Sequence, residues 1–217
     1  RLWDAATGDQ LAVLDAHPSG ALAVAFNADA SLLASAGRDG VIRLWDGVTG
    51  EPVGEPLNGH TDVITALAFT PDDLLIAASR DTTVSVWDAA AGRRLGVLAA
   101  HRDWVQAVAL NADGSLLATA AADGSLLLWT PTGDGAIWRQ VGTALTRQAD
   151  GINALAFTPD GERLAAAGGD RAVLVWRTAM ATWVDRACLL ANRSLTPAEW
   201  NRYLPDSAYR ITCPITP

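Results

Sequence analysis

Tryptophan recurs at a fixed interval through most of this 217-residue chain, and that spacing constrains the fold more than any other feature. The first four members of the series follow one another every 42 residues, and the fifth comes 47 residues later: Trp3, Trp45, Trp87, Trp129 and Trp176. An aspartate stands six residues before each of the last four: Asp39, Asp81, Asp123 and Asp170. One structural unit is therefore copied four times.

Each unit consists of short apolar stretches separated by turn residues, which is typical of β-strands rather than helices. In the second unit the stretch ITALAF is followed by the turn 71–73, then by LLIAAS, and the third stretch ends at Trp87. A fourth stretch, RLGVL, follows at 94–98. The sequence therefore predicts an all-β fold built from four-stranded sheets. The predicted repeats span about 16–58, 59–99, 100–146 and 147–177.

These units resemble the WD repeat of β-propellers. The Trp-Asp pair is intact at 3–4, 45–46 and 87–88, whereas Thr130 and Arg177 replace its aspartate in the last two units. A complete Gly-His pair occurs at 59–60. The resemblance covers residues 1–177 and implies an arc of four four-stranded blades, with one N-terminal strand left over from an upstream blade.

The same resemblance implies a buried hydrogen-bonded set in each blade, made of a histidine, a hydroxyl residue, an aspartate and the tryptophan. The second blade has Ala77 where the hydroxyl belongs, and the last has Gln148 and Ala166 in place of the histidine and the hydroxyl. The implied members are His17, Ser35, Asp39 and Trp45, then His60, Asp81 and Trp87, then His101, Thr119, Asp123 and Trp129, and finally Asp170 and Trp176.

Serine, histidine and aspartate together could also form a hydrolase triad, and three histidines could hold a metal ion. A catalytic site is needed only once, however, whereas this set recurs in every repeat and its histidines belong to different blades. The glycines fall at turns rather than between a strand and a helix, so no phosphate-binding loop is predicted. We therefore expect a chain without catalytic residues, metal or cofactor.

Composition bears on the kind of partner. The chain has 24 acidic and 16 basic residues, a net charge of −8, and no basic stripe, which argues against nucleic acid. Its apolar runs are shorter than the roughly 18 residues of a membrane span, so no membrane association is expected. The only two cysteines are Cys188 and Cys213, which suits the cytoplasm. Arginine without lysine, together with abundant alanine, suggests a bacterial source.

The resemblance also implies where partners bind, because WD-repeat proteins commonly use the loops around the mouth of the propeller channel. Trp104 is the strongest candidate, since aromatic and arginine residues are enriched at binding hot spots. The alternatives are that Trp104 packs on a neighbouring loop and that the arginines are solvated or paired with an aspartate. The candidate residues are Trp104, Arg80, Arg38, Gln106, Thr65 and Asn153.

The repeat pattern stops after Trp176, and residues 178–217 have a different character. Apolar positions recur at helical spacing over 180–192, and Thr196-Pro197-Ala198-Glu199 is a typical helix start. We expect a helical C-terminal cap on the last blade. Within it, Cys188 and Cys213 either form a disulfide or remain two buried thiols.

Taken together, these features predict a non-catalytic interaction scaffold or sensor that binds proteins or peptides. An alternative is the regulatory C-terminal part of a bacterial signalling enzyme, with a nucleotide-binding NTPase or protein kinase domain upstream. Because the chain opens within a repeat, we also expect missing upstream blades of the same polypeptide to be a partner of this segment.

Overall fold

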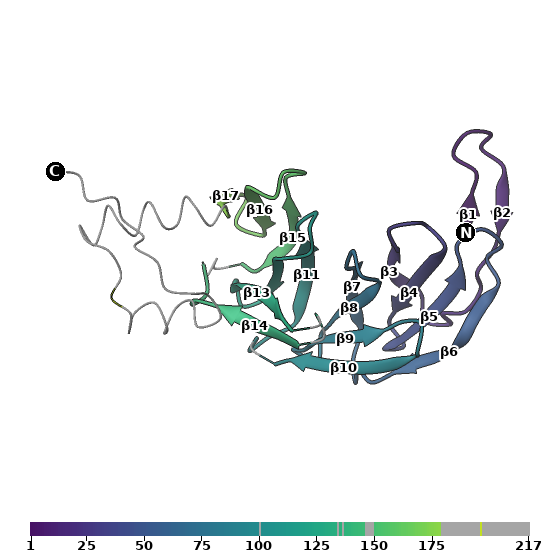
Figure 1. Ribbon diagram of the computed structural model, residues 1–217, viewed down its shortest axis with the longest axis horizontal. Helices are drawn as coiled ribbons and strands as arrows, with labels where there is room; N and C mark the ends of the chain where they lie inside the picture. The colour runs from purple at the N-terminus through teal and green to yellow at the C-terminus, as the bar shows by residue number, and fades with distance from the viewer. Residues whose placement is uncertain (100, 134, 136, 146–149, 179–195, 197–217) are drawn as a thin grey trace.

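The computed structural model describes residues 1–99, 101–133, 135, 137–145, 150–178 and 196. Its strands form antiparallel sheets that follow one another along an arc from the N-terminus to residue 178 (Figure 1). The all-β propeller arc predicted from the repeats is confirmed. The predicted C-terminal helices and the two cysteines lie outside the described residues. Within the described part of the chain, no helix is long and apolar enough to cross a membrane.

Three sheets have four strands each, and we call them blades 1 to 3. Blade 1 contains β3 (Ala21–Phe26), β4 (Leu32–Gly37), β5 (Val41–Asp46) and β6 (Pro52–Asn58). Blade 2 contains β7 (Ile64–Phe69), β8 (Leu74–Ser79), β9 (Val84–Asp88) and β10 (Arg93–Leu98). Blade 3 contains β11 (Val105–Leu110), β12 (Leu117–Ala121), β13 (Leu126–Thr132) and β14 (Ile137–Val141).

The two ends of the arc differ from these blades. Blade 4 has three described strands, β15 (Ile152–Phe157), β16 (Arg163–Gly168) and β17 (Val173–Arg177), rather than four. At the N-terminus, β1 (Leu2–Trp3) pairs with β2 (Gln10–Ala12), so two strands precede blade 1 rather than one. Each complete blade pairs its strands in chain order, because short turns join successive antiparallel strands.

The turn between the second and third strands explains why the repeats carry Asp-Gly there. The residue after the aspartate adopts the left-handed backbone conformation in every blade, which glycine tolerates best. It is Gly40 in blade 1 (φ 69°) and Gly124 in blade 3 (φ 75°). Thr82 (φ 73°) and Arg171 (φ 64°) hold the same conformation with a side chain.

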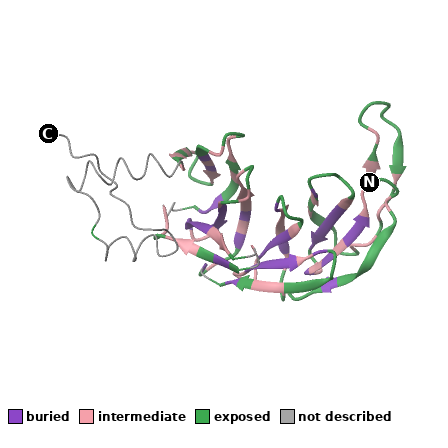
Figure 2. Cartoon of the chain, in the orientation of Figure 1, coloured by how far each residue is buried: buried purple, intermediate pink, exposed green. Residues whose placement is uncertain are grey.

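The apolar core lies between successive blades rather than inside any one of them. Because side chains alternate across a strand, each sheet has one face toward the preceding blade and one toward the following blade. Ile42 and Leu44 of blade 1 pack in one cluster with Ile64 and Leu75 of blade 2. Equivalent clusters join blades 2 and 3 and blades 3 and 4. They bury most of the second and third strands of blades 1 to 3, which are the purple strands in the middle of each blade in Figure 2.

Candidate partner-binding site

In blade 1 the predicted polar residues form one hydrogen-bonded chain. Trp45 Nε1 donates to Ser35 Oγ (2.8 Å), which lies 2.8 Å from His17 Nε2. The other ring nitrogen, His17 Nδ1, is 3.2 Å from both carboxylate oxygens of Asp39. The chain ties the loop before β3 to β4, to β5 and to the turn between them.

Arg43 adds a member to this set that the sequence pattern did not reveal. Its Nη1 donates to Asp39 Oδ2 at 2.6 Å. Burial by itself raises the pKa of Asp39, but the hydrogen bonds from Arg43 and His17 outweigh that effect and hold the pKa below its ordinary value. Asp39 is therefore an ionised acceptor at neutral pH.

Blade 2 replaces the missing hydroxyl from an unexpected position. Ala77 leaves β8 without a hydroxyl, but Ser85 on β9 lies directly across the strand pair from it. Ser85 Oγ accepts from Trp87 Nε1 at 2.6 Å and lies 2.6 Å from His60 Nε2. Contrary to the interpretation from sequence, the set of blade 2 is complete.

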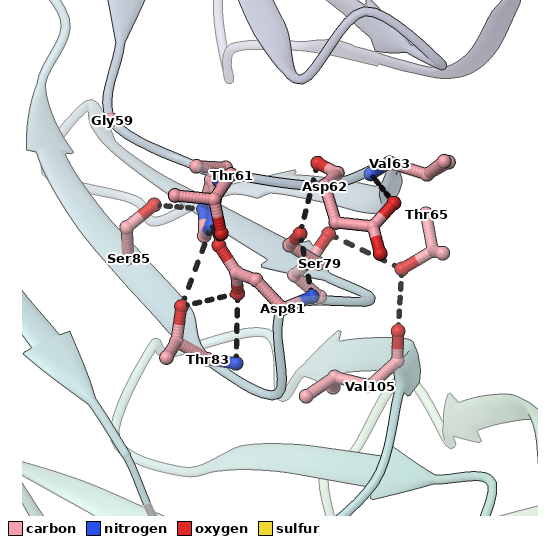
Figure 3. A network of polar contacts seen from close by, with 12 residues as sticks. Gly59, Thr61, Asp62, Val63, Thr65, Ser79, Asp81, Thr83, Ser85 and Val105 are labelled. Atoms are coloured by element: carbon pink, nitrogen blue, oxygen red, sulfur yellow. Dashed lines mark hydrogen bonds and ion pairs between the residues drawn. The ribbon is translucent and has the colours of Figure 1, made fainter.

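The aspartate of blade 2, like that of blade 1, is held by three residues (Figure 3). Asp81 Oδ2 is 2.8 Å from His60 Nδ1 and accepts from the Thr61 N–H, while Oδ1 accepts from the Thr83 hydroxyl at 2.6 Å. Burial favours a higher pKa for Asp81, but the hydrogen bonds from Thr83, His60 and Thr61 outweigh it and lower the pKa.

Blade 3 surrounds its histidine with hydroxyl groups. His101 Nε2 lies 2.7 Å from Thr119 Oγ1, which accepts from Trp129 Nε1, and His101 Nδ1 lies 2.9 Å from Ser125 Oγ. Asp123 Oδ1 accepts the Ser125 N–H. Burial lowers the pKa of His101 to about 4, against the opposing charge of Asp123, so this imidazole is neutral at pH 7.

Blade 4 has less of the set within the described residues. Asp170 Oδ1 accepts the Ala172 N–H at 3.1 Å in the turn, and Ala166 is buried where blades 1 and 3 have a hydroxyl. Trp176 is half-buried and packs against the cluster between blades 3 and 4. Gln148 lies outside the described residues.

The location of the hydroxyls decides what these sets can do chemically. Ser35, Ser85 and Thr119 are at most 5% exposed, and each oxygen already takes part in bonds to a tryptophan and a histidine. A nucleophile must be reachable by substrate, so these hydroxyls serve the packing of the blades. Among the described residues, no three His, Cys, Asp or Glu side chains gather closely enough to hold a metal ion.

The predicted partner-binding residues gather at the edge of the arc that carries the turns before the third strands. There the residue before each turn aspartate is fixed by a backbone hydrogen bond to the loop that leads into the first strand. Arg38 N donates to Gly20 O, Arg80 N to Val63 O, and Ala122 N to Trp104 O. The loops at this edge are therefore held in a repeated geometry.

Arg80 and Trp104 meet across the boundary between blades 2 and 3. The guanidinium carbon of Arg80 lies 4.7 Å from the centroid of the Trp104 ring, a cation–π contact. Trp104 remains 46% exposed despite this contact. Of the two alternatives raised by the sequence, the structure shows that Trp104 packs against a residue of the neighbouring blade.

The other four candidates differ in what they offer. The Thr65 hydroxyl donates to Val105 O of β11 at 2.6 Å and also lies 3.2 Å from Ala78 O, so it serves the contact between blades (Figure 3). Gln106 is half-buried, whereas Arg38 and Asn153 are exposed.

The polar residues that sequence reasoning missed are Arg43, Thr83, Ser85 and Ser125. Each lies two or four residues after the turn aspartate of its blade and belongs to the third strand or the turn before it. Because residues two apart share a face of a strand, their spacing was a usable signal. The four repeats do not share these residue types, which is why aligning them hid the signal.

The family model described as "WD domain, G-beta repeat" matches residues 8–46, 50–88, 92–130 and 138–177. The crystal structure of the computationally designed Ika4 protein is similar, with a TM-score of 0.67 and 27% identity over 78% of this chain and 98% of that chain. No curated protein matches.

Proposed function

Because this chain belongs to the family of the WD domain with the G-beta repeat, we propose that it is a protein-binding scaffold whose contact surface is centred on Arg80 and Trp104. The family supports a role in protein interaction in general. The choice of surface is our own and depends on the geometry of these two side chains. The partners we expect are proteins or peptides.

One observation carries the proposal: an exposed aromatic ring is held in place by an arginine from the neighbouring blade. Arginine and tryptophan are among the side chains enriched where binding energy concentrates. A side chain that is already ordered loses less conformational entropy when a partner binds, which favours affinity. The backbone bonds of Arg80 N to Val63 O and of Ala122 N to Trp104 O order the surrounding loops in the same way.

The buried polar sets support a scaffold by a separate argument. Each set joins the loop before the first strand to the turn before the third strand of its blade, so the loops at the binding edge rest on rigid sheets. Binding loops positioned by a rigid framework are a common arrangement in proteins. In this proposal His17, His60 and His101 hold the surface in position and do not touch the partner.

The test uses the whole chain as one bait and, as a second, a double variant that carries Arg80→Ala and Trp104→Ala. The proteins that each bait retains are compared. A matched control carries Arg93→Ala and Val48→Ala, two exposed residues at the opposite edge of the blades. Proteins retained by the wild type and the control, but lost at least tenfold from the double variant, would support the proposal. Equal retention by all three baits would contradict it. Melting temperatures must agree, since a large drop in the double variant assigns the pair to stability instead.

A further inference from the structure

The three contacts between blades all use the same two faces. The face that a blade turns toward the next one, its trailing face, presents two apolar residues of the third strand. These are Ile42 and Leu44 in blade 1, Val84 and Val86 in blade 2, and Leu126 and Leu128 in blade 3. All six are between 0% and 4% exposed, because the following blade covers them.

Blade 4 has the same trailing face, but no described residue covers it. Val173 and Val175 occupy the positions of Ile42 and Leu44, and they are 67% and 60% exposed. The neighbouring strand contributes Ala165 and Ala167, which match Ala34 and Ala36 of blade 1. The residues are apolar, as at the three covered faces.

The opposite end of the arc exposes the complementary surface, the leading face of blade 1. Val24 and Phe26 on β3 are 68% and 46% exposed. Their equivalents in blade 2, Leu67 and Phe69, pack against the cluster shared with blade 1. Figure 2 shows β3 largely exposed at this end. The described arc therefore presents, at its two ends, the two halves of an interface that occurs three times within it.

The two ends of the arc also complement each other in their number of strands. The four family matches begin with β2 and end with β17, so each match takes in the last strand of one sheet and the first three of the next. Together they contain the strands of four complete sheets. Yet blade 4 has no described fourth strand beside β17, while β2 lies at the far end, paired with the two-residue strand β1.

We propose that two copies of this chain pair head to tail. The trailing face of blade 4, with Val173 and Val175, packs on the leading face of blade 1 of the second copy, with Val24 and Phe26. β2 of the second copy leaves β1 and becomes the fourth strand beside β17. A two-fold axis repeats the contact, so two chains of four blades close into eight, within the range of four to eight blades that propellers adopt.

Sequence equivalence supports this exchange of strands. β2 meets β1 as the fourth strand of a blade meets the third: Trp3 lies opposite Gln10, as Trp45 lies opposite Pro52 in blade 1. Trp176 holds the corresponding place on β17. Only two bridging pairs, Leu2 with Ala12 and Trp3 with Gln10, join β1 to β2. Pairing with the five-residue strand β17 offers a longer partner.

The proposal is tested by measuring the mass in solution of the 217-residue chain across concentrations from about 1 to 100 μM, a range chosen to bracket micromolar affinity. The wild type is expected at twice the 22.7 kDa of one chain. Because each copy contributes one leading and one trailing face, Val24→Asp or Val175→Asp alone puts a charge into both contacts of the ring. Each variant should therefore be a monomer. Val48→Asp, at a 74% exposed position of the turn after β5, is the control and should remain a pair.

Mixing the two variants distinguishes this interface from any other. A chain with Val24→Asp keeps an intact trailing face, and a chain with Val175→Asp keeps an intact leading face. An equimolar mixture should therefore form pairs through one unaltered contact, although each variant alone does not. A contact that used the same patch on both copies would not be restored by mixing.

Three results would overturn the proposal. A monomeric wild type at every concentration means that other residues cover these faces, whether those outside the described part or further blades. An open series of larger assemblies means that the ring does not close. A mixture that stays monomeric refutes the head-to-tail contact. If circular dichroism shows that an aspartate variant has unfolded, the near-isosteric Val24→Thr and Val175→Thr are used, with the dissociation constant expected to rise at least tenfold.

Discussion

Ser85 faces Ala77 across the β8–β9 pair, and it supplies from the third strand the hydroxyl that blades 1 and 3 carry on the second. In blade 1 the two positions are Ser35 and Arg43, and in blade 3 they are Thr119 and Leu127. The hydroxyl has moved between two positions whose side chains lie on the same face of the sheet. The contacts to the histidine and the tryptophan survive the move.

The first prediction follows from that exchange. Ser85→Ala removes the acceptor of Trp87 Nε1 and the partner of His60 Nε2, and should lower the free energy of unfolding by about 2–3 kcal/mol because two buried groups lose a bond. Adding Ala77→Ser restores the arrangement of blade 1 and should recover more than half of the loss. Urea unfolding measures both. If the double variant is no more stable than Ser85→Ala, the two positions are not equivalent.

Thr82 should be replaceable with benefit. Its φ of 73° places a β-branched residue in the left-handed region, which costs about 1–2 kcal/mol. Thr82→Gly removes that cost but adds chain entropy to the unfolded state, so we expect a net gain of roughly 0.5–1 kcal/mol. Thermal unfolding provides the measurement. The reverse change in blade 1, Gly40→Thr, should destabilise the chain, and an opposite sign for either variant refutes the account.

His101 should make stability depend on pH. The unfolded imidazole takes up its proton as the pH falls through about 6.5, whereas the folded one does so only near 4. The unfolded state therefore binds more protons in that window, and the free energy of unfolding should fall as the pH falls, by about 3 kcal/mol in all. Urea titrations at pH 7 and pH 4.5 would show the loss.

The control for that experiment is His101→Gln, which cannot titrate and should flatten the dependence between pH 6.5 and 4. The lowered pKa values of Asp39 and Asp81 affect stability in a more acidic range. Their contribution to the free energy of unfolding is complete above the ordinary carboxyl pKa of 3.8 and is lost as the pH falls below it. If the free energy of unfolding of the His101→Gln variant depends on pH as steeply as that of the wild type, another group causes the pH dependence.

Thr65 should matter for stability rather than for binding. Thr65→Val keeps the shape but removes the hydrogen bond to Val105 O, and about 1 kcal/mol should be lost. Asn153→Ala, at the equivalent but exposed position of β15, should change stability by less than about 0.5 kcal/mol. Partner retention by the Thr65 variant should match that of the wild type. Weaker retention at unchanged stability would return Thr65 to the binding surface.

Repetition made much of this fold predictable. The spacing of Trp45, Trp87 and Trp129 located the third strands, and the recurring aspartates located the turns before them. Residues shared by several repeats, such as His17 and Ser35, could be assigned to one hydrogen-bonded set. Features that differ between the repeats could not be found in this way, among them the hydroxyl of Ser85.

The chain's order of residues by itself determined the all-β class, the four units and the polar residues within each, because alternation and turn chemistry act over a few neighbouring positions. Only the tertiary structure decided which blade covers which face, that Arg80 lies over Trp104, and that Thr65 bonds to β11. Those contacts join residues that are far apart in sequence. Their partners are selected by the packing of whole sheets, which no local pattern encodes.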